Sequence, residues 1–338
     1  MFFQFRFILS IIQMGWPLGS FNIFFDEVID KRGDFMQERL EIDVEGKQLQ
    51  ITNPEKPLWP EIGLRKIDFI RYLIEVSPYF LAYARDRLLT TIRYPHGVED
   101  GKSFYQKNIP KHAPDWISTH VWRDTRYILV QDLATLIWLG NQACLEFHVS
   151  FNTRQRERMP TELVFDLDPS DGDHFERVLE VALNIKKVLD GLGLSSQPKT
   201  SGATGLQIYI PIEPIYTYEE MHLLNKFIAQ YVAAKYPRQV TLERWIKNRG
   251  DKLYFDYLQH GEGRTLPAPY SPRARPLGSV SAPVRWSEIE RGFLPENFTM
   301  LTMPERLKKQ GDLFASITTQ RQNESLDEML GFLRERGM

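Results

Sequence analysis

Residues 163–169 read LVFDLDP, and this short stretch decides how the chain is expected to fold. Three apolar residues lead into Asp166 and Asp168, which project from the same face of a strand about 6.5 Å apart. Pro169 ends the pairing of that strand because it has no backbone N–H to donate. Two carboxylates this close repel each other unless a cation lies between them. The stretch therefore predicts a buried strand that ends at an oxygen-rich site.

A third acidic residue has the same kind of sequence environment. In LYFDYL, Asp256 is a lone acid inside an aromatic and apolar strand, where an unpaired carboxylate is costly. Oxygen-only ligands suit Mg²⁺ or Mn²⁺, and two such ions about 4 Å apart are usual in phosphoryl transfer. We therefore expect Asp166, Asp168 and Asp256 to bind two divalent ions together. The alternative is that the first two aspartates cap the following helix or face water.

Three further segments have residues suited to binding an anionic ligand. TSGATG (200–205) has small residues that let the backbone approach a phosphate, although the composition is also common in hairpins. RTLPAPYSPRAR (264–275) contains three arginines and no acid, which suits triphosphate oxygens or a solvated loop. His148 in LEFHVS is either a core histidine or a phosphate contact.

Strands and helices alternate along the chain, which predicts an α+β (mixed α/β) fold. The pattern around Glu45-Gly46 predicts a hairpin over 39–53, and apolar spacings of three and four predict a helix over 66–84. The apolar run 132–145 predicts a buried helix. We divide the chain near residue 145. The predicted units are an N-terminal module at 36–145, a catalytic module at 146–303 and a helical tail at 304–338.

The composition excludes some classes of protein. Lys and Arg number 42 against 44 Asp and Glu, a net charge of −2, so overall charge gives no indication of a nucleic-acid partner. The single cysteine, Cys144, excludes a disulfide framework and fits a reducing cytoplasm. Residues 1–35 lack a membrane-spanning apolar run and a signal-peptide cleavage site. We expect translation to start at Met36 and 1–35 to be a non-native or disordered extension. A hydrophobic tail packed on the domain is the alternative.

Taken together, these segments resemble a known family. LVFDLDP, then TSGATGLQIYIPI, then YFDYLQ followed by APYSPRAR, resemble the three motifs of the archaeo-eukaryotic primase superfamily, in particular the polymerase domain of bacterial ligase D. The likeness extends upstream to ITNPEKPLWP, FYQKN and LEFHVS and covers roughly residues 40–300. It implies a primase-type fold, in which an N-terminal module accompanies a catalytic module with a central antiparallel or mixed sheet.

The resemblance also implies roles for individual residues. Asp166, Asp168 and Asp256 would be the catalytic and metal-binding residues, with Mg²⁺ or Mn²⁺ as the two ions. The residues implied to bind the incoming nucleotide are His148, Ser201, Gly202, Thr204, Gln207, Gln259 and Arg273. The residues implied to bind DNA are Lys56 and Lys66, at a 5′-phosphate, Phe104 and Tyr105, stacked on the template base, and Lys107, at a phosphate.

Two positions depart from the family pattern. The second motif usually reads SGxKGLH, whereas Thr204 and Gln207 stand here in place of the lysine and the histidine. Glutamine still donates a hydrogen bond to a phosphate oxygen, but without charge. We therefore expect weaker nucleotide binding with the chemistry retained. The adenylation motif KxDG of a ligase is absent from the sequence, so sealing would need a separate ligase.

The function implied by the resemblance is template-directed nucleotide addition, with a preference for ribonucleotides, to 3′ ends at DNA gaps or breaks. The expected partners are DNA with a gap or break and a 5′-phosphate end, NTP or dNTP, Ku and a separate ATP-dependent DNA ligase, and no membrane. The expected location is the cytoplasm, in association with the nucleoid. One alternative is a non-catalytic or weakly catalytic DNA-end-binding module. A DxD glycosyltransferase is the other, and it leaves Asp256 and the arginine loop unexplained.

Overall fold

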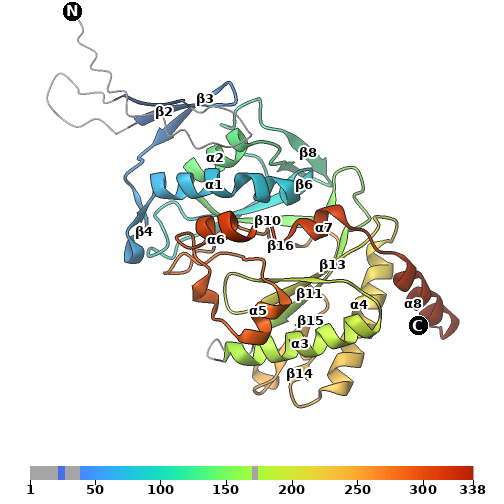
Figure 1. The fold of residues 1–338 in the computed structure, drawn as a ribbon. Helices are drawn as coiled ribbons and strands as arrows, with labels where there is room; N and C mark the ends of the chain where they lie inside the picture. Colours follow the sequence, from blue (N-terminus) through green and yellow to red (C-terminus); the bar gives the residue numbers. More distant parts are fainter. Residues whose placement is uncertain (1–21, 27–38, 170–173, 338) are drawn as a thin grey trace, which may run out of the picture.

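Two β-sheets form the centre of the computed structural model, which describes residues 22–26, 39–169 and 174–337. The first has the strand order β16-β10-β6-β7 and the second the order β12-β13-β11-β15-β14 (Figure 1). The strands of the first sheet are β6 (Arg87–Arg93), β7 (Phe104–Gln106), β10 (Cys144–Thr153) and β16 (Thr265–Pro267). Those of the second are β11 (Glu162–Asp168), β12 (Gln197–Thr200), β13 (Leu206–Pro211), β14 (Val240–Thr241) and β15 (Leu253–Asp256).

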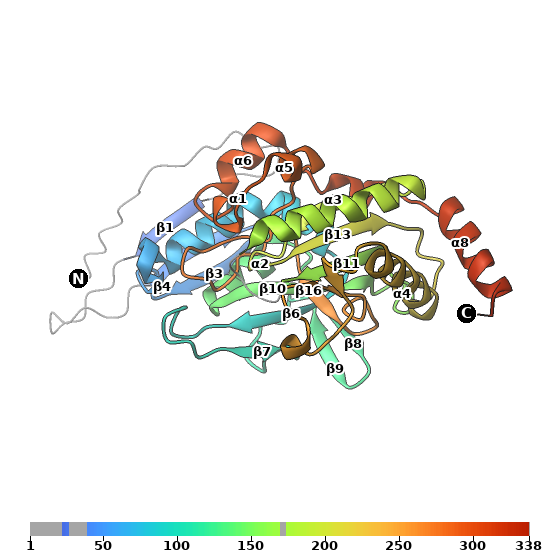
Figure 2. The ribbon, with the colours of Figure 1, turned by 90° about the horizontal axis from the view of Figure 1, so that it is seen from below.

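Helices cover both sheets. Helices α1 and α2 pack together, and α2 also contacts β10 of the first sheet, whereas α3 and α4 contact β11 of the second. Helix α8 packs on α4 at the end of the molecule opposite the N-terminal strands (Figures 1 and 2). The helices are α1 (Lys66–Ala84), α2 (Leu133–Asn141), α3 (Phe175–Gly191), α4 (Tyr218–Lys235), α5 (Trp286–Arg291), α6 (Met303–Gln310), α7 (Ala315–Thr319) and α8 (Glu324–Glu335).

Smaller elements complete the fold. A three-stranded sheet contains β1 (Asn22–Asp26), β2 (Arg39–Val44) and β3 (Lys47–Thr52). Two hairpins pair β4 (Pro57–Trp59) with β5 (Leu64–Arg65) and β8 (Thr119–Trp122) with β9 (Thr125–Ile128). Three short 3₁₀ helices are η1 (Pro60–Ile62), η2 (Ile246–Asn248) and η3 (Pro295–Asn297).

The local predictions rest on patterns that the structure reproduces. The hairpin turn between β2 and β3 is at Glu45-Gly46, and both residues have positive φ, 55° and 78°, as a type I′ turn requires. Helix α1 has the predicted limits of 66 and 84. The expected helix over 132–145 is too long, because α2 ends at Asn141 and β10 begins at Cys144. A continuous apolar run does not distinguish a buried helix from a buried strand.

A buried ion pair joins the two sheets. The guanidinium of Arg87, at the start of β6, donates to both carboxylate oxygens of Glu162, at the start of β11, over 2.9 and 3.0 Å. The hydroxyl of Tyr83 in α1 donates to the same carboxylate over 2.6 Å. All three side chains are buried. Removal of one partner from such a pair typically costs about 3–5 kcal/mol, because the other charge is left buried and unpaired.

The predicted boundary between the two modules falls inside a strand. Residue 145 lies inside β10, and the first sheet also contains β16, which comes from the predicted catalytic module. One hydrophobic cluster includes residues from Leu40 to Leu333, with members of both predicted modules. Of the predicted extension 1–35, residues 22–26 form β1, which pairs with β2, and the rest lie outside the described residues. No helix within the described ranges has the length and apolar character needed to cross a membrane.

Candidate active site

The three predicted aspartates lie on two adjacent strands. In the antiparallel pair β11 and β15, Asp166 lies directly opposite Asp256, and Asp168 lies opposite Tyr254. Directly opposite residues of an antiparallel pair share one face of the sheet, as do residues two apart on one strand. All three carboxylates therefore project from the same face of the second sheet, at the end of β11 that Pro169 terminates.

This cluster has more negative charge than its surroundings neutralise. Burial and the charge of Asp168 raise the pKa of Asp166 well above its usual range. Burial and the charge of Asp256 likewise raise the pKa of Asp168. The carboxylate of Asp256 is held by its own turn, since Oδ1 accepts from the Tyr254 hydroxyl over 3.0 Å and from the backbone N–H groups of Leu258 and Gln259.

Carboxylate oxygens are the ligands that Mg²⁺ and Mn²⁺ prefer, and a divalent cation would offset the repulsion that raises these pKa values. The donor set therefore fits such ions in kind and in its placement on neighbouring strands. As the side chains stand, no group of three or more His, Cys, Asp or Glu residues in the described part of the chain could hold a metal ion.

The turn between β12 and β13 packs directly on this site, and two glycines allow it. A Cβ atom at Gly205 would lie 2.5 Å from the Leu167 carbonyl oxygen and 3.3 Å from Oδ1 of Asp168. A Cβ atom at Gly202, where φ is +72°, would lie 2.6 Å from Cγ of Arg273. The glycines of TSGATG therefore bring this turn against the end of β11 and against the arginine loop.

Ser201 and Thr204 belong to the same turn. The Ser201 hydroxyl oxygen accepts from the backbone N–H groups of Ala203 and Gly205 over 3.1 and 3.0 Å, which fixes the turn from within. The Ser201 carbonyl accepts from the Arg273 guanidinium over 2.6 Å. Thr204 is half-buried beside them.

A carboxylate that the sequence analysis missed organises the predicted nucleotide-binding residues. Glu146 accepts from His148 Nε2 over 2.9 Å, from Arg273 Nε over 2.8 Å and from the Ala274 backbone N–H over 3.1 Å. Burial alone would raise its pKa, but the His148 hydrogen bond and the Arg273 charge lower the pKa of Glu146 to about 2. Burial lowers the pKa of His148. The i, i+2 argument applied to Asp166 and Asp168 would have found Glu146 beside His148.

Gln207 does not face open space. It is buried opposite Asp166 in the β11–β13 pair, and its Nε2 donates to Asp166 Oδ1 over 3.1 Å. Its Oε1 accepts from the ammonium of Lys199, a fully buried lysine that the sequence analysis also missed. Both ends of the amide are thus paired within the protein. Gln259 is tied to the first sheet, since its Nε2 donates to the Thr265 carbonyl over 3.0 Å.

The two lysines predicted at a DNA end lie away from the aspartates, near the start of α1. The ammonium of Lys66 is buried and donates to the carbonyls of Thr52 and Asn141 over 2.5 and 3.1 Å. That of Lys56 donates to the Pro95 carbonyl. Burial, followed by the nearby charge of Lys56, lowers the pKa of Lys66 to about 8.

The predicted stacking residues lie on an edge strand. Phe104 and Tyr105 are in β7 and are 46% and 71% exposed, and Lys107 beyond them is also exposed. The Arg93 guanidinium lies over the Phe104 ring at 5.3 Å from its centroid. These rings are therefore available to a ligand that stacks.

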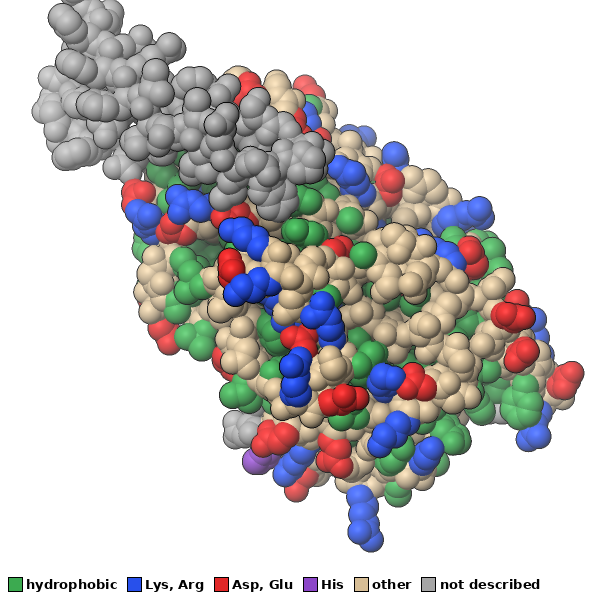
Figure 3. Space-filling model, viewed as in Figure 1, with side chains coloured by type: hydrophobic (Ala, Val, Ile, Leu, Met, Phe, Trp, Pro, Cys, Tyr) green, Lys and Arg blue, Asp and Glu red, His purple; other side chains and the backbone are tan. Residues whose placement is uncertain are grey.

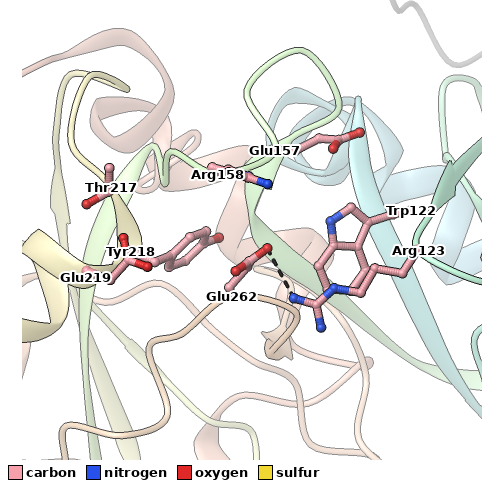
Figure 4. A pocket seen from close by; sticks show the side chains of 8 residues that line it. All are labelled: Trp122, Arg123, Glu157, Arg158, Thr217, Tyr218, Glu219 and Glu262. Atoms are coloured by element: carbon pink, nitrogen blue, oxygen red, sulfur yellow. Dashed lines mark ion pairs between the residues drawn. The ribbon is translucent and has the colours of Figure 1, made fainter.

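A cavity of about 500 Å³ lies elsewhere, and none of its lining residues was predicted to be functional. Trp122 and Arg123 come from the β8–β9 hairpin, and Arg123 pairs with Glu262 over 3.3 Å (Figure 4). The remaining lining residues are Glu157, Arg158, Thr217, Tyr218 and Glu219. On the face seen in Figure 3, Lys and Arg side chains are interspersed with Asp and Glu, in keeping with the net charge of −2.

Comparison with known proteins places the chain in a family. Residues 65–314 match the family model described as "LigD, primase-polymerase domain". The bifunctional non-homologous end joining protein LigD of Bacillus subtilis is 43% identical over 290 residues, which are 86% of this chain and 47% of that protein. A multifunctional non-homologous end joining protein LigD of Mycolicibacterium smegmatis is 30% identical, with 80% of this chain and 36% of that protein covered.

A solved structure agrees with the sequence matches. The polymerase domain from Mycobacterium tuberculosis Ligase D in complex with DNA superimposes with a TM-score of 0.74 and 30% identity, over 81% of this chain and 99% of that one. The chain spans less than half the length of the curated relatives named above. Its α+β architecture is thus the primase-type fold that the sequence predicts, and the chain belongs to the LigD primase-polymerase domain family.

Proposed function

We propose that this protein is a template-directed nucleotidyltransferase. It adds nucleotides, with a preference for ribonucleotides, to 3′ ends at DNA gaps or double-strand breaks, in non-homologous end joining or gap repair. The observation that carries the proposal is the placement of Asp166, Asp168 and Asp256 on one face of β11 and β15, against the glycine turn and the arginine loop. The family membership of the chain supports the same chemistry.

Each group in the site has a task in this reaction. Asp166, Asp168 and Asp256 would hold two Mg²⁺ or Mn²⁺ ions, which when bound supply activation of the primer hydroxyl and charge stabilisation at the triphosphate. Arg273 has a guanidinium suited to triphosphate oxygens, and Glu146 fixes its direction. The half-buried imidazole of His148, whose pKa burial lowers, offers a hydrogen bond beside it. The close-packed turn at Gly202 allows the backbone to approach a phosphate.

The DNA would be held by residues outside this centre. Lys56 and Lys66 would bind the 5′-phosphate on the far side of a gap, and Lys107 a backbone phosphate. The exposed rings of Phe104 and Tyr105 would stack on the template base. Ku and a separate ATP-dependent DNA ligase would complete a repair reaction.

Primer extension tests the proposal. Gapped duplexes with and without a 5′-phosphate, given NTP or dNTP with Mg²⁺ or Mn²⁺, should be extended according to the template base. Extension should be fastest with a 5′-phosphate and with ribonucleotides. Binding of gapped DNA without extension under any of these conditions would exclude a polymerase.

That outcome would favour the second candidate, a non-catalytic or weakly catalytic DNA-end-binding module. The observation that favours it is Gln207, whose amide is paired with Lys199 and Asp166 and supplies no charge to a triphosphate. A module of this kind would retain preference for 5′-phosphorylated ends. It would lose that preference in Lys56→Ala while showing no nucleotide incorporation in either form.

A further inference from the structure

Lys199 is fully buried in β12, and every contact of its ammonium is internal to the protein. It donates to Ser281 Oγ over 2.6 Å and to Gln207 Oε1, and it lies over the Tyr209 ring at 5.3 Å from the centroid. A buried ammonium is costly, so a lysine is expected in such a place only where its charge or its donors are used. Burial lowers the pKa of Lys199 well below its usual range, whereas the negative charge of Asp166, reached through the Gln207 side chain, raises it.

The hydrogen-bond chemistry of these three side chains fixes a direction. In its ammonium form Lys199 donates and does not accept, and Gln207 presents its oxygen to it. The amide NH₂ must then point the other way, and it donates to Asp166 Oδ1 over 3.1 Å. If the Gln207 amide turned over, its oxygen would face the Asp166 carboxylate and its NH₂ would face the ammonium, and both contacts would be repulsive.

We propose that Lys199, acting through Gln207, is a positioning group that holds the Asp166 carboxylate ready for a divalent cation. The proposal rests on the function proposed above and adds a positioning residue to that site. Asp166 lies beside two other carboxylates that repel it, and Gln207 Nε2 is a side-chain donor that contacts it. The two hydrogen bonds that link Lys199 to Gln207 and Gln207 to Asp166 restrain one oxygen of the Asp166 carboxylate, and the carboxylate can still bind a cation. Ser281 acts differently, because it anchors the ammonium to the Thr200 carbonyl through its own hydroxyl.

A double-mutant cycle tests this relay. The variants are Lys199→Met, Gln207→Met and the double variant, with Ser281→Ala as a matched control that removes the other hydrogen bond of the same ammonium. The primary measurement is Mn²⁺ affinity in the absence of DNA and nucleotide, from the electron paramagnetic resonance signal of free Mn²⁺. Thermal unfolding in EDTA reports on folding, and primer extension gives kcat and the nucleotide KM.

Each single variant should weaken Mn²⁺ binding about tenfold, and the double variant should be no weaker than either, because Lys199 acts only through Gln207. Ser281→Ala should bind Mn²⁺ within about twofold of the unmodified protein. In extension, kcat should fall with the nucleotide KM nearly unchanged.

Unchanged Mn²⁺ affinity in Lys199→Met, or effects of the two changes that multiply, would overturn the relay. Should Lys199→Met fail to fold, Gln207→Met decides alone, and unaltered Mn²⁺ affinity in that variant overturns it. These outcomes are separate from a failure of the proposed function. A protein that binds Mn²⁺ but never extends a primer loses the polymerase assignment, while the affinities still decide the relay.

Discussion

Asp166 and Asp168 are held where burial and neighbouring carboxylates raise the pKa of both groups. A carboxyl with a raised pKa binds its proton more tightly in the folded chain than in the unfolded chain. Its contribution to the free energy of unfolding therefore falls as the pH rises from the unfolded pKa towards the folded one. At neutral pH these aspartates destabilise the fold, and a bound cation would relieve that cost.

Asp168→Asn should therefore raise the stability of the fold and lower the activity. In EDTA at pH 7 the variant should melt above the unmodified protein, and the difference should shrink as the pH falls towards 5. Mn²⁺ should raise the melting temperature of the unmodified protein and have little effect on the variant. Primer extension should fall by about three orders of magnitude or more, the loss expected when several kcal/mol of charge stabilisation are removed.

The control is Asp251→Asn, which changes an exposed carboxylate just before β15. It should melt and extend DNA like the unmodified protein. Equal stabilisation of the unmodified protein and Asp168→Asn by Mn²⁺ would remove Asp168 from the set of metal ligands.

We expect Glu146 to affect both the stability of the fold and the binding of nucleotide. Its pKa of about 2 against an ordinary 4.5 means that it stabilises the fold above pH 4.5, by about 3 kcal/mol, and that this stability is lost as the pH falls towards 2. Glu146→Gln should lower the free energy of unfolding at pH 7 by up to this amount. It should also raise the nucleotide KM about tenfold, because the direction of Arg273 is no longer fixed by charge.

A surface carboxylate is the matched control for Glu146. Glu157 pairs with His120 at a more exposed position, and Glu157→Gln should leave both the unfolding free energy and KM nearly unchanged. An unchanged nucleotide KM in Glu146→Gln would show that Arg273 does not depend on Glu146 for its contact with the nucleotide.

We expect the contact between the β12–β13 turn and the end of β11 to decide whether the site assembles. Gly205→Ala would place a methyl group 2.5 Å from the Leu167 carbonyl oxygen, so the turn has to move away from β11. We expect a loss of about 1–3 kcal/mol in the free energy of unfolding. Extension should fall more steeply than stability, because Ser201 and Arg273 move with the turn.

Gly331→Ala in α8 is the control, because a Cβ atom there meets nothing within 4 Å. That change should be neutral or stabilising by up to about 1 kcal/mol. Full activity of Gly205→Ala would mean that the turn tolerates displacement and takes no part in positioning the site. Both variants are compared by urea unfolding and by primer extension.

Elements with a local signature could be predicted, and contacts made by tertiary packing could not. The Glu45-Gly46 turn and the apolar spacing of α1 specify their structures from neighbouring residues. The aspartates could be found because acids in apolar strands are conspicuous. The role of Lys199 could not be predicted from its neighbours in the sequence, because its partners Gln207 and Ser281 are 8 and 82 residues away in the chain.

The whole molecule separates two charged sites. Lys66 stands where the start of α1 meets the ends of β3 and α2, whereas the aspartates occupy β11 and β15 of the second sheet. No element in the described part of the chain carries both sites, so a DNA gap that used both would contact the start of α1 as well as β11 and β15. The 5′-phosphate preference and the chemical step should then respond to different substitutions.

The pH dependence of end recognition provides the sharpest test of this separation. The pKa of Lys66 is about 8, so its ammonium is present at pH 7 and is lost as the pH rises through 8. The ratio of extension on 5′-phosphorylated gaps to that on 5′-hydroxyl gaps should therefore be highest below pH 7 and fall towards pH 9, with the hydroxyl gap correcting for pH effects on chemistry. Lys66→Met should remove this dependence and leave hydroxyl-gap extension intact, and a ratio that stays constant with pH would assign the 5′-phosphate to other residues. Because the pKa of Lys66 in the fold, about 8, lies below the ordinary 10.5, its buried ammonium also lowers the free energy of unfolding below pH 8. This penalty disappears as the pH rises towards 10.5.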